Sequence, residues 1–191
     1  MAKASAPRHV ALLRGINVGG KNSLPMRTLA AMFEAAGAVD VKTYIQSGNV
    51  VYGALPKVAA KIPAAIEKAI EKDLALSIPV VTRTAVELEA VAEANPFLAR
   101  GESEDAVHVM FLADAPTAKA IAGLDPNRSP GDEFTVVGRD IYLFLPNGVG
   151  RSKLSNAYFD SKLATVSTGR NWRTVLKLLE MTRVASSRPT L

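Results

Sequence analysis

The chain has 191 residues, enough for one domain of ordinary size or two small ones, and its 48% hydrophobic and 21% charged residues are usual for a soluble globular protein. It contains no cysteine, which excludes disulfides, thiol catalysis and cysteine-ligated metals and suits a reducing cytoplasm. The formal net charge of +5 permits binding to phosphates or nucleic acid but does not require it, because the cations are dispersed.

The sequence predicts a cytoplasmic protein that does not bind membranes. No run approaches the roughly 18 continuous apolar residues that a membrane-spanning helix needs. Residues 1–9 lack the apolar core of a signal peptide.

The first elements are a strand, a glycine-rich loop and a helix. Residues 9–13 form a short apolar run that predicts a buried strand. A helix is expected over residues 25–36, with Ser23 as its N-cap. Gly37 is expected to end this helix, since glycine adopts the left-handed conformation at little cost.

A hairpin, a helix and a strand are expected next. Residues 41–45 and 49–52 read as strands joined by a turn of hairpin composition. A helix is predicted over residues 57–74, although Pro63 leaves open a start near Ile62. Residues 78–82 form another short strand.

The first half closes with a helix that has a clear start signal. Thr84 and Glu87 have the spacing of a capping box, and Asn95-Pro96 would stop the helix. The polar, glycine-containing residues 100–104 are the best linker in the chain.

After this linker the pattern of elements starts again. The second helix of this half is expected over residues 152–163, and Ser152 is its expected N-cap. The expected elements are a strand over 107–112, a helix over 116–122, strands over 133–137 and 141–145, a helix over 152–163, a strand over 164–167 and a helix over 171–182.

The order strand, helix, strand, strand, helix, strand, helix therefore occurs twice. The first six elements of each copy match the ferredoxin-like β-α-β-β-α-β unit. We expect an α+β protein with two tandem ferredoxin-like units, residues 1–99 and 105–191, each with an extra C-terminal helix. Because each open sheet face needs covering, the copies should pack into one compact molecule.

The loop from Gly15 to Lys21 fits the first seven positions of the phosphate-binding pattern G-x-x-x-x-G-K. Asn22 stands where that pattern has Ser or Thr, and Leu24-Pro25 delays the helix whose N-terminus should face the phosphates. The predicted hairpins also contradict the parallel sheet of that fold. A looser anion-binding nest of backbone amides and a simple tight turn both stay open.

Basic, amide and hydroxyl side chains gather on the predicted loops of both copies. The loop over residues 147–153, with its glycines, Arg and Lys, is interpreted as the second copy's counterpart of the glycine-rich loop. Turn chemistry alone would also explain Asn49, and Arg14 could equally pair with a carboxylate. The candidate ligand-binding residues are Arg14, Asn17, Lys21, Gln46, Ser47, Asn49, Arg151, Lys153, Arg170 and Asn171.

Catalytic chemistry has no clear signal in the sequence. His9 and His108 lie in predicted strands without metal-ligand neighbours at recognisable spacing, so we expect no metal and no cofactor. No nucleophile elbow occurs. The catalytic residues, if the protein is an enzyme, are unknown.

Several motifs resemble one family. They are Leu12 to Gly20, Leu24-Pro25-Met26, Tyr44 to Val50, Asn95-Pro96-Phe97, Pro146 to Leu154 and Arg170-Asn171-Trp172. Their residues and order resemble those of the DUF1697 family across nearly the whole chain. The resemblance implies an α+β fold of two related ferredoxin-like units, and it implies no activity and no catalytic residues.

The leading hypothesis is binding of an anionic ligand, either a nucleotide-like small molecule or a nucleic-acid backbone. The ligand would occupy a cleft between two glycine-rich basic loops at equivalent ends of the copies. The first alternative is an enzyme that acts on a phosphorylated or carboxylated small molecule and stabilises charge with Arg and Lys. The second is a protein-interaction module with no ligand. The oligomeric state is not predicted.

Overall fold

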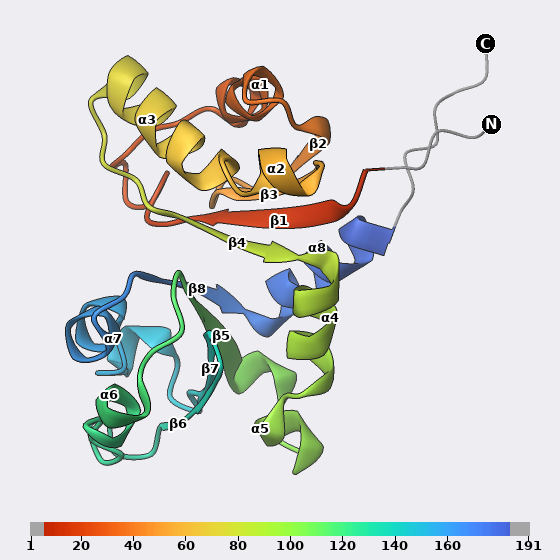
Figure 1. The fold of residues 1–191 in the computed structure, drawn as a ribbon. Coiled ribbons are helices and arrows are strands. Elements are labelled where there is room, and N and C mark those ends of the chain that lie inside the picture. Colours follow the sequence, from red (N-terminus) through yellow and green to blue (C-terminus); the bar gives the residue numbers. More distant parts are fainter. Residues whose placement is uncertain (1–5, 184–191) are drawn as a thin grey trace. The chain divides into compact units, whose positions relative to one another are not determined.

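The computed structural model of the protein describes residues 6–183 and contains two four-stranded antiparallel sheets (Figure 1). Residues 1–5 lie outside the described residues, so most of the N-terminal segment 1–9 is not described. The described chain divides into two compact units. Residues 6–89 and 177–183 form unit 1, and Ala90–Leu176 form unit 2, which includes the expected linker at 100–104.

Unit 1 has the strand order β2-β3-β1-β4, and every neighbouring pair is antiparallel. This is the order of a ferredoxin-like sheet, in which the first strand lies between the third and the fourth. Its elements are β1 (Arg8–Leu13), α1 (Met26–Ala35), β2 (Val39–Tyr44), β3 (Asn49–Gly53), α2 (Pro56–Ala59), α3 (Ile62–Leu74), β4 (Val80–Thr84) and α4 (Ala85–Glu93), which continues into unit 2.

Unit 2 repeats this topology with the strand order β6-β7-β5-β8. The predicted α+β fold of two tandem ferredoxin-like units is therefore confirmed. Its elements are α5 (Pro96–Ala99), the 3-10 helix η1 (Glu104–Ala106), β5 (Val107–Leu112), α6 (Ala118–Ala122), β6 (Glu133–Val137), β7 (Asp140–Phe144), the 3-10 helix η2 (Val149–Arg151), α7 (Asn156–Leu163), β8 (Ser167–Asn171) and α8 (Trp172–Arg183), whose last part belongs to unit 1.

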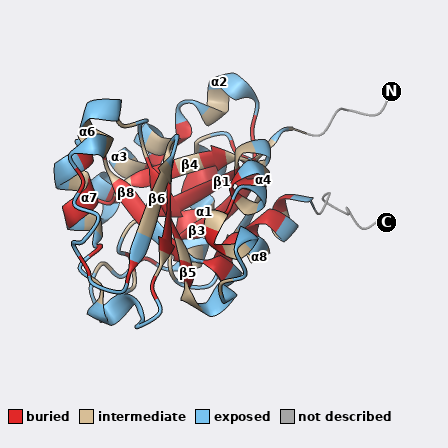
Figure 2. Cartoon of the chain, turned by 90° about the horizontal axis from the view of Figure 1, so that it is seen from below, coloured by how far each residue is buried: buried red, intermediate tan, exposed pale blue. Residues whose placement is uncertain are grey.

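The core of unit 1 lies between its sheet and the helices α1 and α3, which share one side of the sheet (Figure 1). Ala11 and Leu13 of β1 belong to this core, because alternate residues of a strand share a face. Leu29 and Phe33 of α1 and Ile66 of α3 are also fully buried in it. Strands β1 and β3 are buried along almost their whole length (Figure 2).

The core of unit 2 is built in the same way. Met110 and Leu112 of β5 take the places of Ala11 and Leu13. Phe159 of α7 is fully buried in the same cluster. Both units thus place their apolar side chains on the helix-covered face of an antiparallel sheet.

The two units also correspond residue by residue, which element order alone did not reveal. His9 and His108 occupy the same register position in the first strand of each unit. Arg83 and Arg170 lie opposite the residue that follows each histidine, and both are buried. The repetition of side chains at matched positions supports an internal duplication.

Each unit fastens the start of its last strand with a helix carboxylate. The Val80 N–H donates to Glu67 Oε1 of α3 at 2.8 Å. The Ser167 N–H donates to Asp160 Oδ1 of α7 at 2.9 Å. These charge-assisted bonds satisfy equivalent edge-strand amides in the two units.

Two of the expected N-caps are wrong, and one capping box is confirmed. Thr84 N donates to Glu87 Oε2 at 2.7 Å, and Glu87 N donates back to Thr84 Oγ1 at 3.1 Å. Ser23 does not cap α1, because that helix begins at Met26 with Pro25 in the N-cap position. Ser152 does not cap α7 either.

The start of α7 shows why Ser152 fails. Ser155 caps the helix, and its Oγ accepts a hydrogen bond from Tyr158 N at 3.3 Å. Ser152 Oγ instead accepts from Leu154 N at 3.1 Å, directly after the 3-10 turn of η2. The loop before α7 is therefore longer than the sequence suggested.

The expected strand over residues 164–167 is also misplaced, because β8 covers Ser167–Asn171. Ala164 has a φ of +52° and ends α7, so the strand cannot start there. Pairing with β5 keeps the chain extended through Gly169 to Asn171, the residue at which the last helix was expected to begin. For α3 the later of the two expected starts is right, since that helix begins at Ile62.

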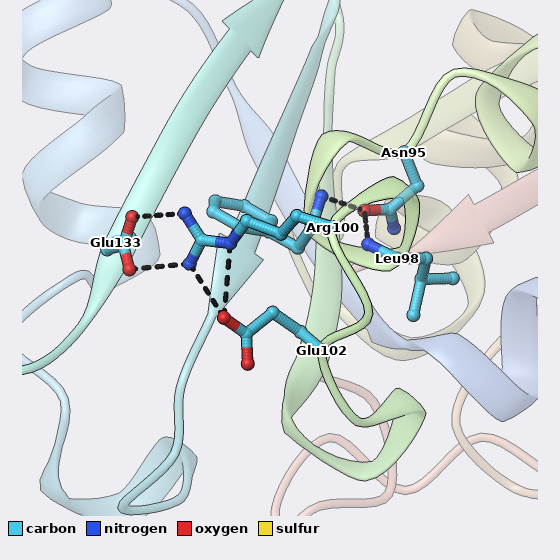
Figure 3. Close-up of polar contacts among 6 residues, drawn as sticks. Asn95, Leu98, Arg100, Glu102 and Glu133 are labelled. Atoms are coloured by element: carbon cyan, nitrogen blue, oxygen red, sulfur yellow. Dashed lines mark hydrogen bonds and ion pairs between the residues drawn. The ribbon is translucent and has the colours of Figure 1, made fainter.

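Residues 95–102 are held to β6 within unit 2 (Figure 3). Asn95 Oδ1 caps α5 by accepting from the N–H groups of Phe97 and Leu98. The Arg100 guanidinium makes two hydrogen bonds to Glu133, at 2.9 and 2.6 Å, and one to Glu102 at 3.1 Å. This fork holds the pKa of Glu133 below its ordinary value.

Substitution of Gly48 by alanine can test how closely the β2–β3 turn packs on the end of β1. Its φ is +76°, and a Cβ there would lie 2.7 Å from Leu13 Cβ and 3.0 Å from Ile16 Cδ1. Gly20 has nearly the same φ, +75°, with nothing within 4 Å. Gly20→Ala should therefore lower the free energy of unfolding by about 1 kcal/mol, from backbone strain alone.

Gly48→Ala should lower it by roughly 1–3 kcal/mol more, because the extra methyl overpacks the site. Urea unfolding of both variants measures the difference. Equal losses for the two variants would show that the turn yields to the added methyl.

Candidate functional site

Three segments of unit 1 meet at the end of the sheet where β1 stops. Leu13 N donates to Gly48 O at 2.8 Å, which joins β1 to the turn between β2 and β3. Arg14 N donates to Pro79 O at 3.1 Å, which joins it to the segment before β4. We call residues 14–25 the glycine loop, residues 45–48 the hairpin turn, and the surface that they share the loop end of unit 1.

The tip of the glycine loop is a tight turn. Gly19 and Gly20 have φ values of +57° and +75°, and Lys21 N donates to Val18 O at 3.0 Å. Positive φ at both central residues is the mark of a type I′ turn, which glycines adopt without strain. The two central residues are exposed, and their N–H groups meet no acceptor among the described residues.

Asn17 fastens the glycine loop to the hairpin turn. Its Nδ2 donates to Leu24 O at 2.9 Å and to Gln46 O at 2.8 Å, and its Oδ1 accepts from Leu24 N at 2.9 Å. Asn22 adds a second tie within the loop, from its Nδ2 to Gly15 O at 2.9 Å. The backbone of the loop is therefore fixed by side-chain amides.

Asn49 has the same kind of role in the hairpin turn. It is fully buried, and its Nδ2 donates to Tyr44 O at 3.1 Å and to Ser47 Oγ at 2.9 Å. Asn17 and Asn49 are among the predicted ligand-binding residues. In the structure their amides hold the backbone of the glycine loop and of the hairpin turn.

Four other predicted residues belong to the loop end, and two of them are exposed. Lys21 and Gln46 are exposed, and across residues 6–183 neither side chain makes a hydrogen bond or ion pair. Arg14 and Ser47 are half-buried beside them in the chain segments just described. The fold thus brings basic and polar groups from two separate loops to one end of the sheet.

The site lacks the geometry of a nucleotide-hydrolysing loop. Helix α1 begins only at Met26, so its N-terminus is not at Lys21. All strand pairs of unit 1 are antiparallel, whereas that fold requires a parallel sheet. The delayed helix and the hairpins, which argued against this kind of loop in the sequence, are therefore both present in the structure.

Arg151 and Lys153 lie on a different kind of loop from the one expected. They follow β7 and precede α7, so the equivalent segment of unit 1 follows β3. Phe144, the last residue of β7, lies opposite the first residue of β5, Val107. The expectation of equivalent ends is wrong, because the glycine loop follows the last residue of the first strand, at the opposite end of the equivalent sheet.

Arg170 and Asn171 have structural partners in unit 2. Arg170 is 8% exposed, and its Nη1 donates to Thr168 Oγ1 at 2.9 Å and to Gly169 O at 2.7 Å. Burial lowers the pKa of Arg170 to about 10. Asn171 Oδ1 accepts from Thr174 N at 2.8 Å and caps α8.

Sequence reasoning missed Arg83, which repeats the arrangement of Arg170. Arg83 is 2% exposed, and its Nη1 donates to the carbonyl of the preceding residue, Thr82, at 2.8 Å. Each arginine is the last but one residue of its observed strand. The expected strands, residues 78–82 and 164–167, end before both arginines, so the correspondence emerges only from the observed pairing with the first strand of each unit.

The histidines do not form a metal site. His9 is buried, stacks on Tyr52 with ring centroids 5.4 Å apart, and has Nε2 3.3 Å from Ala54 O. Burial lowers the pKa of His9 and favours its neutral form. Within residues 6–183, no group of three or more His, Asp or Glu side chains could hold a metal ion.

None of the helices within residues 6–183 is long and apolar enough to cross a membrane.

Two hollows lie away from the loop end. One of about 470 Å³ runs between α1 and α3 and is lined mainly by alanines and Met32. The other, of about 180 Å³ in unit 2, is lined by His108, Asn171 and Trp172 with three charged side chains. Neither includes a residue of the glycine loop or the hairpin turn.

Residues 7–142 match the family described as "Protein of unknown function (DUF1697)". No curated protein matches the chain. The fold is similar to that of the conserved bacterial protein SP0830 from Streptococcus pneumoniae, with a TM-score of 0.70 and 20% sequence identity, over 93% of this chain and 99% of that chain. At this identity the likeness shows the fold alone.

The contribution of the three Asn17 side-chain hydrogen bonds to stability can be tested by a substitution that keeps the backbone conformation of this residue. Asn17 has a φ of +54°, which glycine adopts freely, so Asn17→Gly removes the three hydrogen bonds without adding strain. At 0.5–1.5 kcal/mol for each bond, we expect unfolding to become easier by about 2–4 kcal/mol.

Asn22→Gly is the matched control, since Asn22 has a φ of +50° and makes one such bond. It should cost about 1 kcal/mol. Thermal or urea unfolding measures both losses, and a smaller loss for Asn17→Gly than for Asn22→Gly would contradict this role of Asn17.

Proposed function

We propose that this chain, which belongs to the DUF1697 family, binds an anionic ligand at the loop end of unit 1. The ligand is a nucleotide-like small molecule or a nucleic-acid backbone. The observation that carries the proposal is the bond from Asn17 Nδ2 to Gln46 O at 2.8 Å. It holds the basic glycine loop against the polar hairpin turn, so that groups from both serve one ligand.

The chemistry of the loop end suits a negative charge. Lys21 supplies a mobile ammonium without a partner in the described chain, and the exposed N–H groups of Gly19 and Gly20 add donors beside it. Arg14, half-buried in the same loop, adds a second positive charge to that loop. Because the asparagine hydrogen bonds fix the loop backbone, the loop loses little conformational freedom when a ligand binds.

The salt dependence of binding distinguishes the two versions of the ligand. A nucleic-acid backbone presents several phosphates, and each contact between a phosphate and a cation releases counterions. A small anion makes fewer such contacts.

The first test is the loss of charge at the loop end. Arg14→Ala and Lys21→Ala should each weaken binding of a nucleoside 5′-phosphate or a short oligonucleotide by roughly 10-fold or more, the usual cost of one charged hydrogen bond. Lys57→Ala is the control, because this exposed lysine lies in α2, after the opposite end of β3. Titration calorimetry or fluorescence anisotropy measures the affinities.

Equal affinity of wild type and both loop-end variants would overturn the proposal. For the nucleic-acid version, affinity should fall steeply with salt concentration. Binding that depends only weakly on salt would restrict the ligand to the small-molecule class.

A further inference from the structure

Ile45 has a backbone conformation that its side chain disfavours. It is the first residue of the hairpin turn and has a φ of +48°. Among residues 6–183 the other non-glycine residues with positive φ are Asn, Asp or Ala, none of which is branched at Cβ. A β-branched residue in the left-handed region is an outlier, and such strain persists where function requires the side chain.

Burial does not explain why isoleucine stands at this position. Its surface is 53% exposed, so the core gains little from it. Val18, at the tip of the glycine loop, is 62% exposed. Both flank the bond between the two loops, since Val18 follows Asn17 and Ile45 precedes Gln46. The loop end therefore has two solvent-exposed aliphatic side chains on the same two loops as its basic and polar groups.

We infer that the ligand of the loop end is a nucleotide whose base packs on Ile45 and Val18. The inference rests on the proposed function and names the ligand class. An inorganic anion has no apolar surface for these side chains to cover. A heterocyclic base has apolar faces and a polar edge, and the exposed Gln46 amide can both donate to that edge and accept from it. The phosphate then lies toward Lys21 and the Gly19–Gly20 turn.

An anionic lipid surface is the competing partner for a basic loop with bare aliphatic tips. It would use Val18, Ile45 and Lys21 but has no counterpart for the exposed Gln46 amide. Two aliphatic side chains also bury little apolar area, whereas stable binding at a membrane surface scales with that area. The observations favour the nucleotide.

The strain makes the test unusually specific. Ile45→Asn places at this position a residue type that tolerates positive φ and removes the aliphatic side chain. The variant should melt at a higher temperature than wild type and yet bind nucleotide more weakly. A residue that serves only the fold would not shift these two quantities in opposite directions.

The probes are the four nucleoside 5′-monophosphates and ribose 5-phosphate, which has the same sugar and phosphate but no base. Wild type should bind at least one nucleotide tenfold or more tighter than ribose 5-phosphate. Ile45→Asn should remove most of this advantage and leave ribose 5-phosphate affinity unchanged. Val18→Asn, which involves no strained position, should also weaken nucleotide binding. Val86→Asn, at a 75% exposed valine of α4, is the control and should change nothing.

Each other outcome has a distinct meaning. If ribose 5-phosphate and nucleotides bind equally, or if Ile45→Asn and Val18→Asn bind nucleotide as wild type does, the base contact is wrong while anion binding stands. If no phosphate compound binds wild type, the proposed function fails and this inference fails with it. Binding to phosphatidylglycerol vesicles without nucleotide binding would assign the loop end to a lipid surface and overturn the inference.

Discussion

The loop end of unit 1 depends on the side chain of one asparagine. Asn17 uses both of its amide protons and its oxygen on backbone groups, two of them on Leu24 and one on Gln46. The first pair closes the glycine loop on itself, and the third bond attaches that loop to the turn between β2 and β3. Without these bonds the glycine loop and the hairpin turn would be held together less firmly, by contacts such as the packing of Ile16 beside Gly48. A ligand that needed both would then have to order them itself, and the cost would reduce its affinity.

Much of the fold could be predicted from the sequence because local and tertiary preferences agree there. Residues 9–13 and 107–112 are apolar, and each becomes the central strand that pairs on both sides. The Thr84–Glu87 capping box needs only residues three apart, so its geometry is readable from spacing. The order of such elements was enough to identify two ferredoxin-like units.

The rest could not be predicted, because tertiary contacts decide it. The expected strand ended at Ser167, whereas pairing with β5 extends the observed strand through Gly169 to Asn171. Ser23 and Ser152 are good caps by type, but the chain delays both helices beyond them. Turn chemistry offered a structural role for Asn49, but no sequence pattern shows that the Asn17 amide bonds backbone groups of Leu24 and Gln46. Likeness of composition also paired the glycine loop with the loop after β7, although the topology places them at opposite ends of equivalent sheets.

The duplication separates what maintains the fold from what is particular to one unit. The features that both units share, such as His9 with His108 and the carboxylates of Glu67 and Asp160, lie in strands and helices and serve the scaffold. The connection after the first strand is not shared. It spans residues 14–25 in unit 1 but only residues 113–117 in unit 2. A repeated scaffold whose first connection is longer in unit 1 points to that connection as the place where unit 1 acquired its own role, since binding residues tend to lie on loops that a rigid scaffold positions.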